Sequence, residues 1–188
     1  MKPRLVVLIL CASLLAAVQA RAKTILPDAC GDDKVTFDVN TEKHPPAPAP
    51  PAAGKAQIVL IETMNKPMLC FECGSATIRF GMDGTWVGAN KGNSYFTLDI
   101  TPGAHDLCTD WQSIFGSLKQ KIGTTSFTAE SGKVYYFVAK VKFKVYGQGE
   151  GTGPGANIAR HLKFSQLSDD DGQYRVKASE LATWTTSK

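Results

Sequence analysis

One segment constrains the fold more than any other: from Tyr135 to Tyr146, apolar side chains alternate with lysines and other residues. One face would carry Tyr135, Phe137, Ala139, Val141, Phe143 and Val145, and the other would carry Lys140, Lys142, Lys144 and Tyr146. A period of two is typical of a strand with one buried face and one solvated face. The segment therefore predicts a long strand in an antiparallel sheet.

Shorter segments with the same character occupy much of the remaining chain, and turn residues separate them. They cover residues 34–39, 57–62, 77–82, 94–100, 125–129 and 158–167. Asp83-Gly84 follows the segment 77–82 and is a strong signal for a tight hairpin, with residues 86–88 on the return strand. Seven or eight short strands at regular spacing predict a mainly β protein, an antiparallel β-sandwich, with an open barrel as the alternative.

One short helix is expected near the C-terminal end of the chain. Ser168 can act as its N-cap, and three aspartates follow at positions where a helix N-terminus favours anions. The helix would run to about Ala178, although Gly172 would weaken it.

The N-terminus has the pattern of a secretory signal peptide. Lys2 and Arg4 precede an apolar run from Leu5 to Val18, and Val18-Gln19-Ala20 fits a cleavage site for signal peptidase. The run is short for a membrane span, and no longer apolar run follows. Loss of Lys2 and Arg4 lowers the formal net charge from +4 to +2, so a nucleic acid partner is not expected. The sequence predicts an exported protein that is periplasmic, outer-membrane-associated or secreted.

The organisation expected along the chain has five parts. They are a signal peptide (1–20), an extension with one strand (21–42), a Pro/Ala-rich linker (43–56), the β-sandwich domain (57–182) and a tail (183–188). The linker contains five prolines in seven residues, which favours a stiff, extended spacer over a helix or central strand. It can also serve as a ligand for a proline-binding groove.

Four cysteines remain after cleavage, and in an oxidising compartment they predict two disulfides with three possible pairings. The favoured arrangement joins Cys30 to Cys108 and Cys70 to Cys73. The alternative is a metal or redox site. Cys70, Cys73, His105 and Cys108 form the donor inventory of a zinc site, and Cys70 and Cys73 have the spacing of a redox pair. Export argues against zinc, and the expected loop around Cys70 and Cys73 argues against a redox pair, which typically lies at a helix N-terminus. No metal or other cofactor is expected.

No arrangement typical of catalysis stands out. No Gly-x-Ser-x-Gly motif is present, and the glycine-rich segment 147–157 lacks the ending of a phosphate-binding loop. The lysines at 140, 142 and 144 have two interpretations: a surface for an anionic polymer, or a protective charged face on an exposed strand.

Several motifs together resemble a bacterial family of small exported domains of unknown function, similar in pattern to PEGA-type surface domains. The resemblance covers about residues 30–178 and rests on the segments Cys30-Gly31, Met82–Gly88, Asn93–Phe96, Pro102–Cys108 and Phe127–Phe137. It implies a β-sandwich and transfers no catalytic residues. We therefore expect a non-catalytic binding or accessory module of the cell envelope with an unknown envelope component as its partner.

Overall fold

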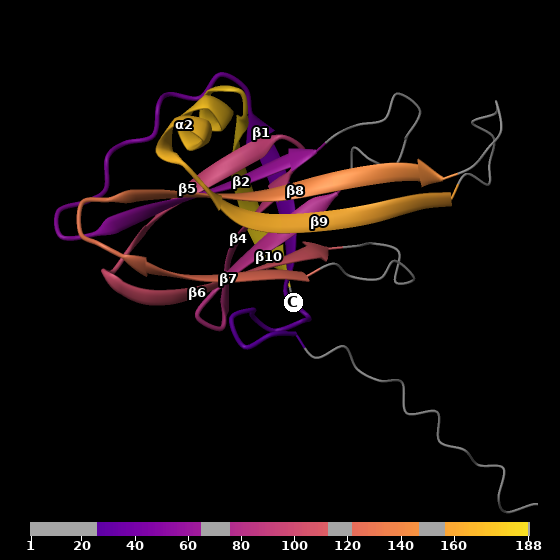
Figure 1. Cartoon of the computed structure of the whole chain (residues 1–188), viewed down its shortest axis with the longest axis horizontal. Helices are drawn as coiled ribbons and strands as arrows, with labels where there is room; N and C mark the ends of the chain where they lie inside the picture. The colour runs from indigo at the N-terminus through magenta and orange to yellow at the C-terminus, as the bar shows by residue number, and fades with distance from the viewer. Residues whose placement is uncertain (1–25, 65–75, 113–121, 147–156, 188) are drawn as a thin grey trace, which may run out of the picture.

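The computed structural model describes residues 26–64, 76–112, 122–146 and 157–187. In these residues the chain forms ten strands and one helix (Figure 1). In chain order they are β1 (Thr36–Glu42), β2 (Ala56–Met64), β3 (Thr77–Met82), β4 (Thr85–Lys91), β5 (Ser94–Ile100), β6 (Gly103–Gln112), β7 (Ile122–Ala129), β8 (Val134–Tyr146), β9 (Asn157–Leu167), α2 (Asp169–Lys177) and β10 (Glu180–Ser187).

The strands form two sheets, which confirms the predicted β-sandwich. The larger sheet has the order β1-β10-β5-β2-β8-β9, and the smaller has the order β4-β3-β6-β7. Most neighbours are antiparallel, but β2–β8 and β5–β10 are parallel pairs. The helix α2 lies on the outer face of the larger sheet (Figure 1). In the described part of the chain, none of the helices is long and apolar enough to cross a membrane.

The strand count exceeds the seven or eight predicted, in part because the C-terminal segment is a strand. β10 includes the residues expected to be a tail, and it pairs with β1 on one side and with β5 on the other. Its own sequence alternates weakly, since Thr183 and Thr185 lie on one face and Thr186 on the other. Pairing on both sides stabilises a strand whose local pattern is poor.

The sequence predicted the hairpin turn and the helix cap correctly, in contrast to the strand β10. Asp83 and Gly84 both have positive φ angles, 51° and 85°, as a tight hairpin between β3 and β4 requires. Ser168 caps α2, and its side-chain oxygen accepts a hydrogen bond from the Asp171 N–H. Both predictions are confirmed.

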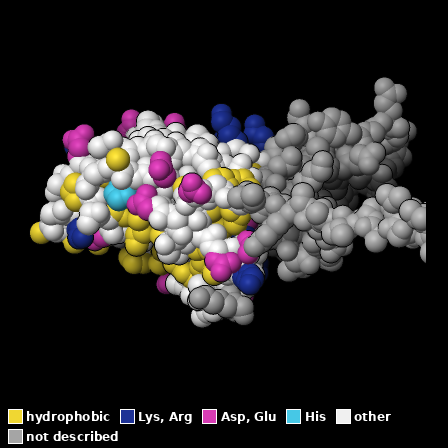
Figure 2. Space-filling model, turned by 90° about the horizontal axis from the view of Figure 1, so that it is seen from below, with side chains coloured by type: hydrophobic (Ala, Val, Ile, Leu, Met, Phe, Trp, Pro, Cys, Tyr) yellow, Lys and Arg dark blue, Asp and Glu magenta, His cyan; other side chains and the backbone are white. Residues whose placement is uncertain are grey.

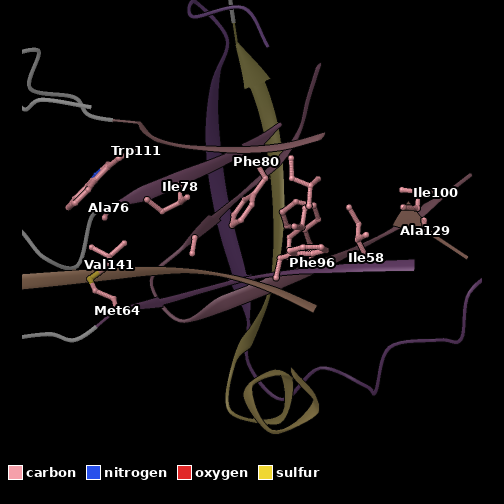
Figure 3. Packing of buried hydrophobic residues seen from close by; sticks show 14 of the residues in the cluster. Ile58, Met64, Ala76, Ile78, Phe80, Phe96, Ile100, Trp111, Ala129 and Val141 are labelled. Atoms are coloured by element: carbon pink, nitrogen blue, oxygen red, sulfur yellow. The ribbon is translucent and has the colours of Figure 1, made fainter. Parts of the chain in front are cut away.

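The main core fills the space between the two sheets (Figure 3). Phe80 and Phe96 meet edge to face with ring centroids 5.7 Å apart, and Phe96 meets Trp184 at 4.6 Å. Such geometry contributes about 0.5–1.5 kcal/mol per pair beyond area burial. Gly88 allows the close approach of Trp184, because a Cβ atom there would lie 2.6 Å from the Trp184 ring.

The segment before β1 covers the outer face of the smaller sheet. Cys30 is joined to Cys108 of β6, with Cα atoms 5.2 Å apart. Trp86 Nε1 donates a hydrogen bond to the Asp32 carbonyl oxygen over 2.7 Å. Beneath this segment, the Arg79 guanidinium stacks on Trp86 and pairs with Asp110. The residues before β1 are thus fixed by one covalent bond and a buried polar cluster.

Candidate functional site

The connection from β1 to β2, residues 43–55, crosses the outer face of the larger sheet, and we call it the strap. The strand directions explain its path. β1 and β2 run the same way, so the end of β1 and the start of β2 lie at opposite ends of the sheet. β9 and β10 also run the same way as each other, opposite to β1 and β2. The connection between them must therefore also cross the sheet, from the other end, and it contains α2. Figure 1 shows the strap and α2 on the same side of this sheet.

The strap contacts the rest of the protein with a repeat of three residues. Pro45, Pro48 and Pro51 are half-buried, whereas the residues between them are exposed. Three residues per turn is the period of a polyproline II helix, which has no internal hydrogen bonds and suits a proline-rich segment. The strap was predicted to be a stiff, extended linker. In the structure the segment joins β1 to β2, and residues 43–50 form one wall of a groove on the sheet.

A polar latch holds the second half of the strap. The Gln57 side-chain amide donates hydrogen bonds to the Ala49 carbonyl oxygen, over 3.1 Å, and to Asp99 Oδ1, over 3.2 Å. The Ala52 N–H donates to Asp99 Oδ2 over 3.1 Å. Gln57 and Asp99 face each other across β2 and β5, so the latch is anchored on paired strands.

The helix α2 forms the opposite wall. Gly172 and Val176 face the sheet and are buried, while Gln173 and Lys177 border the space between the helix and the strap. The helix approaches the sheet closely because Gly172 has no side chain. A Cβ atom at this position would lie 2.1 Å from Cγ of Tyr136. The glycine that weakens the helix locally is thus what allows it to pack here.

Between the two walls lies a groove of about 960 Å³. Val59, Tyr95 and Tyr136, from three adjacent strands, line its floor together with the side chains of Gln57 and Val134. Burial raises the pKa of both tyrosines, and the charge of Asp169 adds to the shift at Tyr136. Both hydroxyls therefore stay protonated at neutral pH and are available as hydrogen-bond donors.

One end of the groove, where the two walls converge, is lined by polar residues. Glu42 pairs with Leu181, which brings the start of the strap next to the residues that follow α2. Lys43, His44, Lys177, Ser179 and Glu180 line this end. The volume and the mixture of an apolar floor with a few polar groups are typical of ligand sites.

The structure describes two of the four residues of the predicted metal site, His105 and Cys108, and both have other partners. The Cys108 sulfur is bonded to Cys30, which agrees with the favoured disulfide and removes Cys108 as a thiolate ligand. His105 engages both of its ring nitrogens elsewhere, with Asp83 and Thr101. Cys70 and Cys73 lie outside the described residues. The Cys70–Cys73 disulfide therefore stays a prediction, as does the redox alternative.

His105 links two turns at the edge of the sandwich. Its Nδ1 lies 2.7 Å from Asp83 Oδ2 and its Nε2 lies 2.8 Å from the Thr101 carbonyl oxygen. Burial lowers the pKa of His105, but these two contacts and the charges of Asp83 and Asp106 raise it by more than burial lowers it. The pKa of His105 therefore lies above its ordinary value. The pKa of Asp83 is lowered, because the bonds to His105 and to the Asp106 N–H outweigh its partial burial. Figure 2 shows a face of the molecule on which acidic side chains lie beside a histidine.

The lysines of β8 lie on the same outer face as the groove. Lys140 is half-buried and Lys142 is exposed, and Lys140 pairs directly with Lys163 of β9. The Lys144 side chain lies outside the described part, as does almost all of the glycine-rich segment 147–157. No ion pair joins Lys140, Lys142 or Lys163 to an acidic group among the described residues. The alternation predicted for this strand is confirmed where side chains are described, since Phe137, Ala139 and Val141 are buried in the core.

The groove itself was not predicted from the sequence. Its walls come from residues 43–50 and 173–180, which are far apart in the chain. One signal was available, since three of the five prolines recur at intervals of three and mark one face of a polyproline II helix. Comparison with models of protein families, with curated proteins and with solved structures finds no match for this chain.

Proposed function

We propose that the protein is an exported, non-catalytic binding module of the cell envelope, and that its ligand lies in the groove between the strap and α2. The groove is the single observation that carries this proposal. It combines a floor of buried tyrosine and valine with walls held by the Gln57–Asp99 latch and by the close packing at Gly172. A wall that is fixed before binding loses little conformational entropy when a ligand enters.

The chemistry of His105 supports a structural role rather than a catalytic one. A general base must present a free nitrogen to the proton that it removes. Both His105 nitrogens are already engaged, and the carboxylate that contacts it belongs to a hairpin turn. The Ser126 hydroxyl donates a hydrogen bond to Asp106 Oδ1, over 2.5 Å, rather than to His105.

A neutral, environment-sensitive apolar dye tests the groove without assuming a natural ligand. We expect the dye to bind the full-length protein and its fluorescence to rise. Gln173→Trp fills the groove from the helix side and should abolish most of this signal. Gln166→Trp, at an exposed site on β9 outside the groove, is the matched control and should leave it unchanged. Equal dye binding by the two variants contradicts the proposal.

Export is tested separately by the mass of the protein recovered outside the cytoplasm. The pattern of residues 1–20 and the Cys30–Cys108 disulfide support this part of the proposal. We expect a chain that begins at Arg21, with two intact disulfides and no bound metal under non-reducing conditions. A full-length chain retained in the cytoplasm contradicts export, and free thiols at Cys70 and Cys73 favour the redox alternative.

A second candidate function is binding to an anionic polymer. It is favoured by the position of Lys140 opposite Lys163, because like charges that face each other across a sheet are destabilising unless an anion lies near them. Alanine at Lys140, Lys142 and Lys163 should abolish salt-sensitive retention on heparin. Alanine at three exposed lysines elsewhere, Lys34, Lys91 and Lys133, controls for net charge. Equal losses in the two triple variants exclude a specific lysine face.

A further inference from the structure

We propose that the ligand of the groove is a proline-rich segment of a partner protein, bound in the polyproline II conformation beside the strap. This inference rests on the proposed function, since it names the class of ligand for the same groove. Three observations carry it: the strap that already lies on this face, the hydrogen-bonding groups that line the groove, and the walls and floor, which exclude recognition by addition of a strand.

The strap shows which backbone conformation this face of the sheet accepts. Pro45, Pro48 and Pro51 form its half-buried face, and the groove that it borders is floored by Tyr95 and Tyr136. Grooves lined by aromatic residues are the usual sites for polyproline II ligands, because flat rings pack against the pyrrolidine ridges. The protein thus already holds one proline-rich segment at a groove of about 960 Å³ that two tyrosines also line.

The polar groups in the groove favour a ligand that accepts hydrogen bonds. The hydroxyls of Tyr95 and Tyr136 and the ammonium groups of Lys43 and Lys177 are all donors, and Glu180 is the one carboxylate in the lining. A proline-rich segment is rich in acceptors and poor in donors. Its carbonyl oxygens make no internal hydrogen bonds, and its prolines carry no N–H.

The walls exclude recognition by addition of a strand. Pro45, Pro46, Pro48 and Pro50 have no backbone N–H, so the strap wall cannot form a continuous ladder with an extended peptide. The strands of the floor, β5, β2 and β8, are interior strands of the sheet and are paired on both sides. An extended chain that entered the groove would leave its own N–H groups without backbone partners, which a proline-rich chain avoids.

The experiment uses the full-length protein and two synthetic peptides. The first has the sequence of residues 43–54, and the second carries alanine at each of its five prolines, so that length and charge are matched. We expect the proline peptide to bind in titration calorimetry or fluorescence anisotropy, at least tenfold more tightly than the alanine peptide. Equal affinities, or no binding of either peptide, would overturn the proposal.

Variants locate the peptide in the groove. Gln173→Trp should weaken binding at least tenfold, whereas Gln166→Trp should leave it unchanged. Ala47→Trp fills the groove from the strap side and gives the same answer if the first variant fails to fold. Tyr136→Phe removes one donor and should weaken binding three- to tenfold. Binding that survives both groove-filling variants places the peptide elsewhere and refutes the inference.

The outcomes also separate this inference from the proposed function. If the apolar dye binds in the groove and the proline peptide does not, the groove is a ligand site and its ligand is of another class. If neither enters the groove, both proposals fail.

Discussion

Replacing Gly172 by alanine tests how α2 is held on the sheet. Alanine is a better helix former than glycine by about 1 kcal/mol, so an exposed helix would become more stable. Here the new Cβ would lie 2.1 Å from Cγ, 2.5 Å from Cδ1 and 2.6 Å from Cβ of Tyr136. Carbon atoms normally meet at about 3.5–4 Å. A change of rotamer moves Cγ and Cδ1, but Cβ is fixed by the backbone of β8, so a change of rotamer cannot fully relieve the overlap.

The helix must therefore move away from the sheet by more than an ångström. Overpacking of this kind costs about 1–3 kcal/mol, and part of the burial of Val176 is lost as well. After the gain in helix propensity, we expect a net loss of about 1–2 kcal/mol. For a chain of this size that loss lowers Tm by roughly 3–6 °C. Thermal and urea unfolding followed by circular dichroism measure both quantities.

The same substitution in a second background separates the overlap from the helix propensity. A Tyr136→Gly protein lacks all three overlapping atoms, Cβ included, so Gly172→Ala should there become neutral or stabilising, by up to about 1 kcal/mol. The sign of the effect should therefore reverse between the two backgrounds. A higher Tm for Gly172→Ala in the wild-type background would show that the helix is not seated on Tyr136 as described.

Three further predictions concern the elements that hold the sandwich together. The contact between His105 and Asp83 is strongest between about pH 4 and 6.5: it is lost as pH rises through the raised pKa of His105 or falls through the lowered pKa of Asp83. Tm should fall between pH 6 and 8 in the wild type and less in His105→Phe. Cys108→Ser opens a disulfide loop with a sequence separation of 78 and should cost about 4 kcal/mol in urea unfolding. Asp110→Ala leaves the buried guanidinium of Arg79 without its carboxylate and should cost about 3–5 kcal/mol. A loss below 1 kcal/mol for Asp110→Ala would show that water reaches this cluster.

The features that were predictable from the sequence are those set by neighbouring residues. The hairpin at Asp83-Gly84 follows from two residues that tolerate positive φ, and the start of α2 follows from the side chain of Ser168. The long strand β8 follows from its alternation. Each of these signals lies within a few positions of the structure that it specifies.

The features that were missed depend on contacts between distant segments. β10 is a strand because β1 and β5 flank it, and its own pattern does not reveal this. The groove exists because the strap and α2 cross one face in opposite directions, which depends on the order of strands in the sheet. The five prolines of the strap indicated that this segment is stiff, but no local rule says which surface a stiff segment will lie on.

The pairing of β1 with β10 has a consequence for the order of folding. Thr36 lies opposite Ser187 and Glu42 lies opposite Leu181, so this pair joins segments at nearly the greatest sequence separation in the chain. Closing so long a loop is entropically costly, and topologies with such contacts fold slowly. On a ribosome, β1 has no neighbouring strand in its sheet until β10 has been synthesised. The start of the strap, tethered through β1, cannot be fixed by this pairing before that moment, so the groove would be among the last features of the molecule to form.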